Sequence, residues 1–181
     1  AGLADYAINN LAYFTKEVPL VSFPLGYLIY KDPNSVVTDW GSAFEAAQAA
    51  NLIFSQEPNI LSGQGALIII PMQAGDTLSS IYATISQKIF FGGAIYGGYA
   101  PLDAELLAAA TAFTAGKTML FISQDQTTVL NGGGLFNTIQ SATENYARCL
   151  LYTVSPQAAR FLAAAYAARA MSVDFNGSLR S

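Results

Sequence analysis

The sequence predicts an α/β protein in which alternating strand and helix units form a mostly parallel sheet covered by helices. Short aliphatic runs alternate with helical patterns along the chain, an order typical of βαβ units. The run at residues 66–70 is apolar at every position, as expected of a strand covered by helices on both faces. Because the 181 residues include no linker-like stretch, one domain is predicted.

We divide the chain into three parts. Residues 1–25 show no pattern that we can assign, residues 26–171 carry the predicted α/β core, and residues 172–181 are predicted to form a short strand and a turn. Val173 and Phe175 alternate with polar residues, as in a strand. Asn-Gly favours tight turns, so the turn is predicted at residues 176–177.

The core is predicted to begin with a strand at residues 26–30, followed by a turn and an Ala-rich helix over residues 43–55. Ser42 and Glu45 fit a capping box, in which two side chains satisfy free N–H groups at a helix start. Trp40 is interpreted as a core anchor beside a tight turn, and a ligand platform is the less favoured alternative.

A helix with one apolar face is predicted after the strand at residues 66–70. Asp76 or Thr77 can supply its N-terminal cap. Its apolar residues recur at the spacing of one helix face, and they are Leu78, Ile81, Tyr82, Ile85 and Ile89.

A glycine-punctuated strand at residues 90–96 precedes a helix that begins near Pro101 and ends at Gly116. Asp103 and Glu105 fall in the first turn of this helix, where negative charge is favourable. Two residues apart on a helix means a rotation of about 200°. The two carboxylates therefore face different sides and cannot act as a catalytic pair.

The remaining elements follow the same alternation. They are a strand at 118–123, a helix at 135–142, a strand at 148–153 and a helix at 155–169 that starts with Ser155 as its cap and Pro156 in its first turn. We expect the strands at 66–70, 118–123 and 148–153 to lie buried in one sheet.

Composition limits the partners. Charged residues make up 11% of the chain, against ~25% in typical soluble domains, which indicates either a surface buried against partners or a large core. The net charge is −4 and the eight Lys and Arg are scattered, so we expect no nucleic acid partner. No apolar run approaches the ~18 residues of a membrane span, so membrane insertion is not expected. The single cysteine, Cys149, is interpreted as an inert buried thiol.

No sequence pattern indicates catalysis. The chain contains no histidine, which removes the commonest general base and nearly every zinc site. Residues 111–118 resemble the end of a P-loop, but Thr111 replaces the first glycine and the segment leads from a helix into a strand. The glycine clusters at 92–98 and 132–134 fit no dinucleotide fingerprint. The first is interpreted as permitting a bend or close backbone approach, and the second as a loop. We expect no enzyme, no catalytic residue, no cofactor and no metal.

One longer pattern resembles a known family. Residues 29–58 run IYKDPNSVVTDWGSAFEAAQAANLIFSQEP, and residues 168–178 run ARAMSVDFNGS. The first combines a strand-like end, a turn, a D-W-G-S link and an Ala-rich helix that closes on I-F-S-Q-x-P. Together they resemble the core domain of sheath proteins from contractile bacteriophage tails.

The resemblance implies a structural subunit of the virion tail, made in the cytoplasm of the bacterial host, that serves tail assembly, contraction and genome delivery. Its partners would be neighbouring sheath subunits and the tail tube, and extended arms of one subunit would complete a sheet in its neighbours. The implied assembly-interface candidates are Val173, Asp174, Phe175, Asn176 and Gly177.

The chain departs from the family pattern in two places. A β-rich insertion usual in relatives would fall near residues 71–76, where only a short link is present, and relatives continue beyond the match at residues 168–178. By itself the chain is therefore expected to be monomeric or weakly associating. The alternative function is a small doubly wound ligand-binding or enzymatic domain with its site at the carboxyl ends of the strands.

Overall fold

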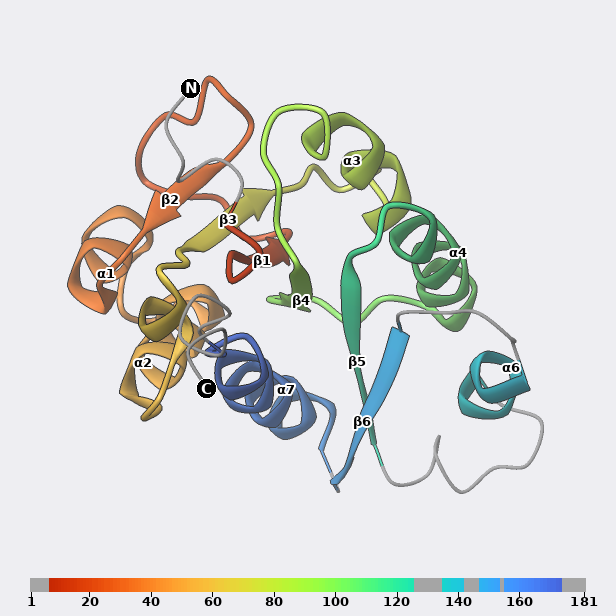
Figure 1. The fold of residues 1–181 in the computed structure, drawn as a ribbon. Helices are drawn as coiled ribbons and strands as arrows, with labels where there is room; N and C mark the ends of the chain where they lie inside the picture. The colour runs from red at the N-terminus through yellow and green to blue at the C-terminus, as the bar shows by residue number, and fades with distance from the viewer. Residues whose placement is uncertain (1–6, 126–134, 142–146, 154, 174–181) are drawn as a thin grey trace.

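The structure is a computed structural model that describes residues 7–125, 135–141, 147–153 and 155–173 (Figure 1). Its strands are β1 (Leu11–Thr15), β2 (Leu28–Tyr30), β3 (Leu67–Pro71), β4 (Gly93–Gly97), β5 (Met119–Asp125) and β6 (Ala147–Thr153). They form one sheet in the order β2-β3-β1-β4-β5-β6. All strands are parallel except β2, which pairs antiparallel with β3 at one edge. The predicted α/β class with a mostly parallel sheet is confirmed.

Helices cover both faces of this sheet. They are α1 (Pro33–Trp40), α2 (Glu45–Ser55), α3 (Leu78–Ile85), α4 (Asp103–Ala115), α6 (Leu135–Ser141) and α7 (Pro156–Ala170), with a short 3-10 helix at Ile60–Gly63. Helices α3, α4 and α6 pack on one face, and α1, α2 and α7 pack on the other (Figure 1). Along β1, Ala12 and Phe14 face the first layer, whereas Leu11 and Tyr13 face the second, which is the two-residue period of a strand.

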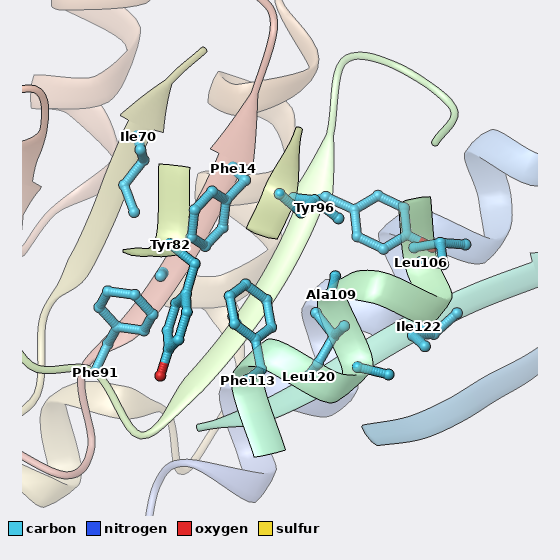
Figure 2. Packing of buried hydrophobic residues seen from close by; sticks show 14 of the residues in the cluster. Phe14, Ile70, Tyr82, Phe91, Tyr96, Leu106, Ala109, Phe113, Leu120 and Ile122 are labelled. Carbon is cyan, nitrogen blue, oxygen red and sulfur yellow. The ribbon is translucent and has the colours of Figure 1, made fainter. Parts of the chain in front are cut away.

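The layer under α3 and α4 is filled by aromatic rings (Figure 2). The ring of Phe113 lies 4.1 Å from that of Tyr82 and 5.6 Å from that of Phe14, measured between centroids. In the opposite layer the helices α2 and α7 contribute mainly alanines, which pack beside larger side chains such as Trp40 and Phe121. We call these the aromatic layer and the alanine layer.

Strand β1 lies in the middle of the sheet, although the prediction left residues 1–25 unassigned and began the core at residue 26. All five residues of β1 are buried, including Thr15. The run was missed because Tyr13 and Thr15 interrupt its aliphatic pattern and no helical pattern precedes it. The core therefore begins near Leu11.

A helix occupies the segment that was predicted as a turn and a D-W-G-S link. Asp32 caps α1 by accepting a hydrogen bond from the Ser35 N–H at 2.8 Å, and Pro33 opens the helix. This Asp-Pro start is a recognised N-terminal signal. Trp40 is fully buried, and its Nε1 donates to the Tyr30 hydroxyl at 3.1 Å, so its interpretation as a core anchor is confirmed.

The capping box predicted at Ser42 and Glu45 is wrong. Helix α2 begins at Glu45, and Phe44 at its N-cap makes no side-chain cap bond. The cap comes instead from Glu17, whose carboxylate accepts the N–H groups of Glu45 at 2.7 Å and Ala46 at 2.8 Å. A cap supplied from distant sequence leaves no local pattern.

The predicted helix after residues 66–70 is confirmed, with Thr77 as its cap and Ser80 completing a capping box. Gly116 ends α4 as predicted, but the left-handed residue is Lys117, with φ of 61°. Gly116 is required for a different reason, since a Cβ there would meet the Tyr82 hydroxyl. That hydroxyl and Thr118 Oγ1 form a buried hydrogen bond of 2.9 Å.

The predicted strands at 118–123 and 148–153 are confirmed as members of the sheet, in β5 and β6. Cys149 lies in β6, and its side chain falls outside the described atoms, as does the glycine cluster at 132–134. The helix predicted at 155–169 is α7, capped by Ser155.

Candidate functional site

The strand order marks one place where a ligand would be expected. Strand β3 lies on one side of β1, and the next strand along the chain, β4, lies on the other side. The direction in which successive strands are added to the sheet therefore reverses between β1 and β4. Open α/β sheets bind ligands beyond the carboxyl ends of their strands at such a switch point. Here those ends are Thr15 of β1 and Gly97 of β4, which are paired in register.

A carboxylate of the protein itself occupies the anion position at this switch point. The N-terminus of α2 presents free N–H groups and the positive end of the helix dipole, an arrangement that binds phosphates in many proteins. The Glu17 carboxylate accepts two of these N–H groups. The Glu17 N–H donates to Thr15 Oγ1 at 3.1 Å, which fixes the turn after β1.

A largely buried ion pair lies beside Glu17. Arg160 of α7 donates from Nε to Glu45 Oε1 at 2.7 Å and from its terminal nitrogen to Glu45 Oε2 at 3.0 Å. The side chains are 12% and 9% exposed. The hydrogen bond with Glu45 raises the pKa of the Arg160 guanidinium. This bidentate pair joins the start of α2 to α7 across the end of the sheet.

The remaining space is filled by Tyr13. Burial, and secondarily the negative charges of Glu45 and Glu17, raise the pKa of the Tyr13 hydroxyl well above its ordinary value. Within the described part of the chain this hydroxyl has no hydrogen-bond partner. A Cβ at Gly97 would overlap the Tyr13 hydroxyl, and one at Gly98, with φ of 71°, would meet Thr15 and Glu17. The interpretation of these glycines as positions of close backbone approach is confirmed.

A groove of about 600 Å³ opens next to the switch point, between α3 and the loop that joins β1 to β2. We call it the α3 groove. Apolar side chains of Val18, Phe23, Met72 and Ile81 line it together with the ammonium groups of Lys16 and Lys88.

Asp103 and Glu105 do not form a site. Glu105 Oε1 accepts the Leu78 N–H of α3 at 3.0 Å and the Tyr99 hydroxyl at 3.1 Å. Burial and Glu105 raise the pKa of Tyr99. Glu105 thus caps α3, a second helix N-terminus that is satisfied by a carboxylate from another element.

Of the predicted interface candidates the structure describes Val173 alone, at the amino end of the strands. Val173 is half-exposed, and its carbonyl accepts a hydrogen bond from Asn9 Nδ2 at 2.8 Å. Asp174, Phe175, Asn176 and Gly177 lie outside the described residues. The residues at the switch point were missed because Tyr13, Lys16 and Glu17 fall in the unassigned N-terminal part. The available signal was the charged pair Lys16-Glu17, which directly follows the run at residues 11–15.

Among the described residues, no three His, Cys, Asp or Glu side chains gather as a metal site would require. The helices in this part of the chain are all too short or too polar to cross a membrane. No family model matches the chain, and neither does any curated protein.

Proposed function

We propose that the chain is a structural subunit of a contractile tail sheath, which works by contacts with copies of itself and with the tail tube. The similarity of residues 29–58 and 168–178 to sheath core domains supports this function. The low content of charged residues, 11%, is consistent with a surface that is partly covered in an assembly.

The observation that carries the proposal is a set of exposed aliphatic side chains in the loop between β1 and β2, together with an open sheet edge. In the loop between β1 and β2, Val18, Leu20 and Leu25 are 68%, 70% and 58% exposed, and Ile29 on β2 is 49% exposed. Exposed aliphatic side chains in a loop and on the strand that follows it are available to contact a partner. Strand β2 is the edge of the described sheet, and an edge strand offers backbone groups to a partner strand.

The filled switch point supports assembly over catalysis. Glu17 and the ion pair between Glu45 and Arg160 take the positions that a bound anion would need. A ligand would have to displace a carboxylate that caps a helix. The polar groups there are used to hold α2 and α7 on the sheet.

Sedimentation velocity over a concentration series, with negative-stain electron microscopy of the most concentrated sample, tests the proposal. We expect weak association that grows with concentration and is lost in Leu20→Asp, with an unchanged Tm because Leu20 is exposed. Leu102→Asp is the matched control, since Leu102 is 76% exposed at the N-cap of α4, where Asp is favourable. Association that is as strong in Leu20→Asp as in the original chain contradicts the role of this surface in the proposal.

The second candidate is a doubly wound ligand-binding or enzymatic domain, and the strand order with its switch point favours it. A thermal-shift screen with nucleotides and sugar phosphates separates the two functions. Stabilisation by one of these compounds, larger in Glu17→Ala because that change frees the N–H groups of Glu45 and Ala46, would favour the second candidate.

A further inference from the structure

The α3 groove lies beyond the carboxyl ends of β1 and β3, where a parallel sheet offers room for a ligand. Lys16 directly follows β1 and Pro71 is the last residue of β3, and both line the groove. The volume of about 600 Å³ falls within the ~300–1,000 Å³ of small-molecule sites. The groove therefore has the position and the size of a ligand site in an α/β protein.

One face of α3 and of the turn after it supplies two kinds of contact. Ile81, Thr84 and Lys88 recur at the spacing of one helix face, and all three line the groove. Ile81 and Phe23 are partly buried and contribute apolar surface. Along this face an apolar side chain is thus followed by a hydroxyl and then by an ammonium.

The two lysines of the groove differ in what they already contact. Lys16 Nζ donates to the Ala74 carbonyl at 3.0 Å and lies 4.9 Å from the centroid of the Tyr99 ring, which is a cation–π contact. Lys88 Nζ donates to the Leu25 carbonyl at 3.0 Å, and among the described residues it meets neither a carboxylate nor an aromatic ring. Two of its three donors are therefore available to a ligand.

The two carboxylates of the groove do not neutralise Lys88. Glu17 accepts N–H groups of α2, which packs on the other face of the sheet from α3. Asp76 accepts the Gln73 N–H at 2.7 Å and precedes α3, whereas Lys88 follows it. The eight residues of α3 separate the two by ~12 Å, more than the Debye length of ~8 Å at physiological salt. The Lys88 end is therefore the cationic end of the groove.

We propose that the α3 groove binds a small amphipathic monocarboxylate of the kind represented by a medium-chain fatty acid. The carboxylate contacts Lys88 and Thr84, and the apolar body lies against Ile81 and Phe23. One available ammonium matches one negative charge, whereas a phosphate dianion would bring an unpaired charge against an apolar wall. This inference goes beyond the proposed assembly and does not depend on it.

An NMR titration of the isotopically labelled full chain with octanoate tests the proposal. We expect saturable shifts centred on the amides of Ile81, Thr84 and Lys88. Octanol keeps the chain without the charge and should bind about tenfold more weakly. Acetate keeps the charge without the chain and should bind about a hundredfold more weakly or less. No saturable binding of octanoate, shifts centred on another surface, or equal binding of acetate or inorganic phosphate overturns the proposal.

A variant separates the charge of Lys88 from its effect on the loop. Lys88→Met keeps the apolar stem of an exposed side chain, so octanoate binding should fall about tenfold while octanol binding is unchanged. Lys31→Met is the matched control, because Lys31 is exposed and does not line the groove, and it should bind both compounds as the original chain does. If Lys88→Met weakens both compounds equally, Lys88 acts by holding the loop and the proposed carboxylate contact is overturned.

Discussion

The two helix layers of this protein cover the two faces of one sheet, and they pack against it with different kinds of side chain. In the aromatic layer, rings of Phe14, Tyr82, Phe91 and Phe113 fill a wide space between the sheet and the helices α3 and α4. In the alanine layer, Ala46, Ala47, Ala164 and Ala167 are small enough for α7 to lie close to α2 and to the strands β4 and β5.

The difference determines where polar groups are tolerated. In the aromatic layer, the buried hydroxyls of Tyr82 and Thr118 satisfy one another through a hydrogen bond. Short side chains in the alanine layer bring the helices close enough for Glu45 and Arg160 to pair across them. We therefore expect the aromatic layer to be most sensitive to loss of volume and the alanine layer to loss of charge balance.

The largest effect is expected in the aromatic layer. Phe113 is fully buried against the rings of Phe14 and Tyr82. Phe113→Ala should lower the free energy of unfolding by ~3–5 kcal/mol, because it removes apolar contacts and leaves a cavity. Urea denaturation followed by circular dichroism measures this change.

Phe161→Ala supplies the matched control, since Phe161 of α7 is only partly buried beside the alanine layer. We expect a loss of about 1 kcal/mol there. Equal losses in the two variants would contradict the contrast between the layers.

The second effect concerns the ion pair. Arg160→Met keeps most of the side-chain volume but leaves the Glu45 carboxylate largely buried without its cation, so we expect a loss of ~3 kcal/mol. The same denaturation experiment measures it.

A double variant tests the physical cause. Adding Glu45→Gln to Arg160→Met removes the unpaired charge and should recover most of the lost stability. A double variant as unstable as Arg160→Met would show that Arg160 stabilises the protein by packing and not by its charge.

Local patterns were sufficient for much of this fold. The strand at 66–70 and the helix at residues 78–85 were predictable because apolar runs and periodicity are properties of neighbouring residues. The same reasoning identified Ser155 as the cap of α7.

Long-range contacts explain the failures. Glu17 caps α2 from 28 positions away in the sequence, so this cap has no local signature. The Ser42 and Glu45 pattern was misleading because Glu45 has a stronger partner in Arg160, 115 positions away. The α3 groove could not be predicted from the sequence either, because the loop between β1 and β2 and the helix α3 come together only in the folded chain.

The smallest effect is expected in the alanine layer, where the Tyr13 hydroxyl is buried. Within the described residues the Tyr13 hydroxyl is unpaired, so Tyr13→Phe should raise the free energy of unfolding at neutral pH by about 1 kcal/mol. Burial raises the pKa of Tyr13 in the folded chain, whereas in the unfolded chain it ionises near pH ~10.

This difference fixes the pH dependence. The stability that is linked to the raised pKa of Tyr13 is fully present below pH ~10 and is lost as the pH rises further, because only the unfolded chain releases the proton there. Burial also raises the pKa of Tyr30 and Tyr99, so Tyr13→Phe should make the alkaline loss shallower without abolishing it. Urea denaturation at neutral pH and above pH ~10 tests both expectations. A variant less stable than the original chain at neutral pH would mean that the Tyr13 hydroxyl is hydrogen-bonded in the folded protein, and that the alanine layer has no unpaired polar group at its edge.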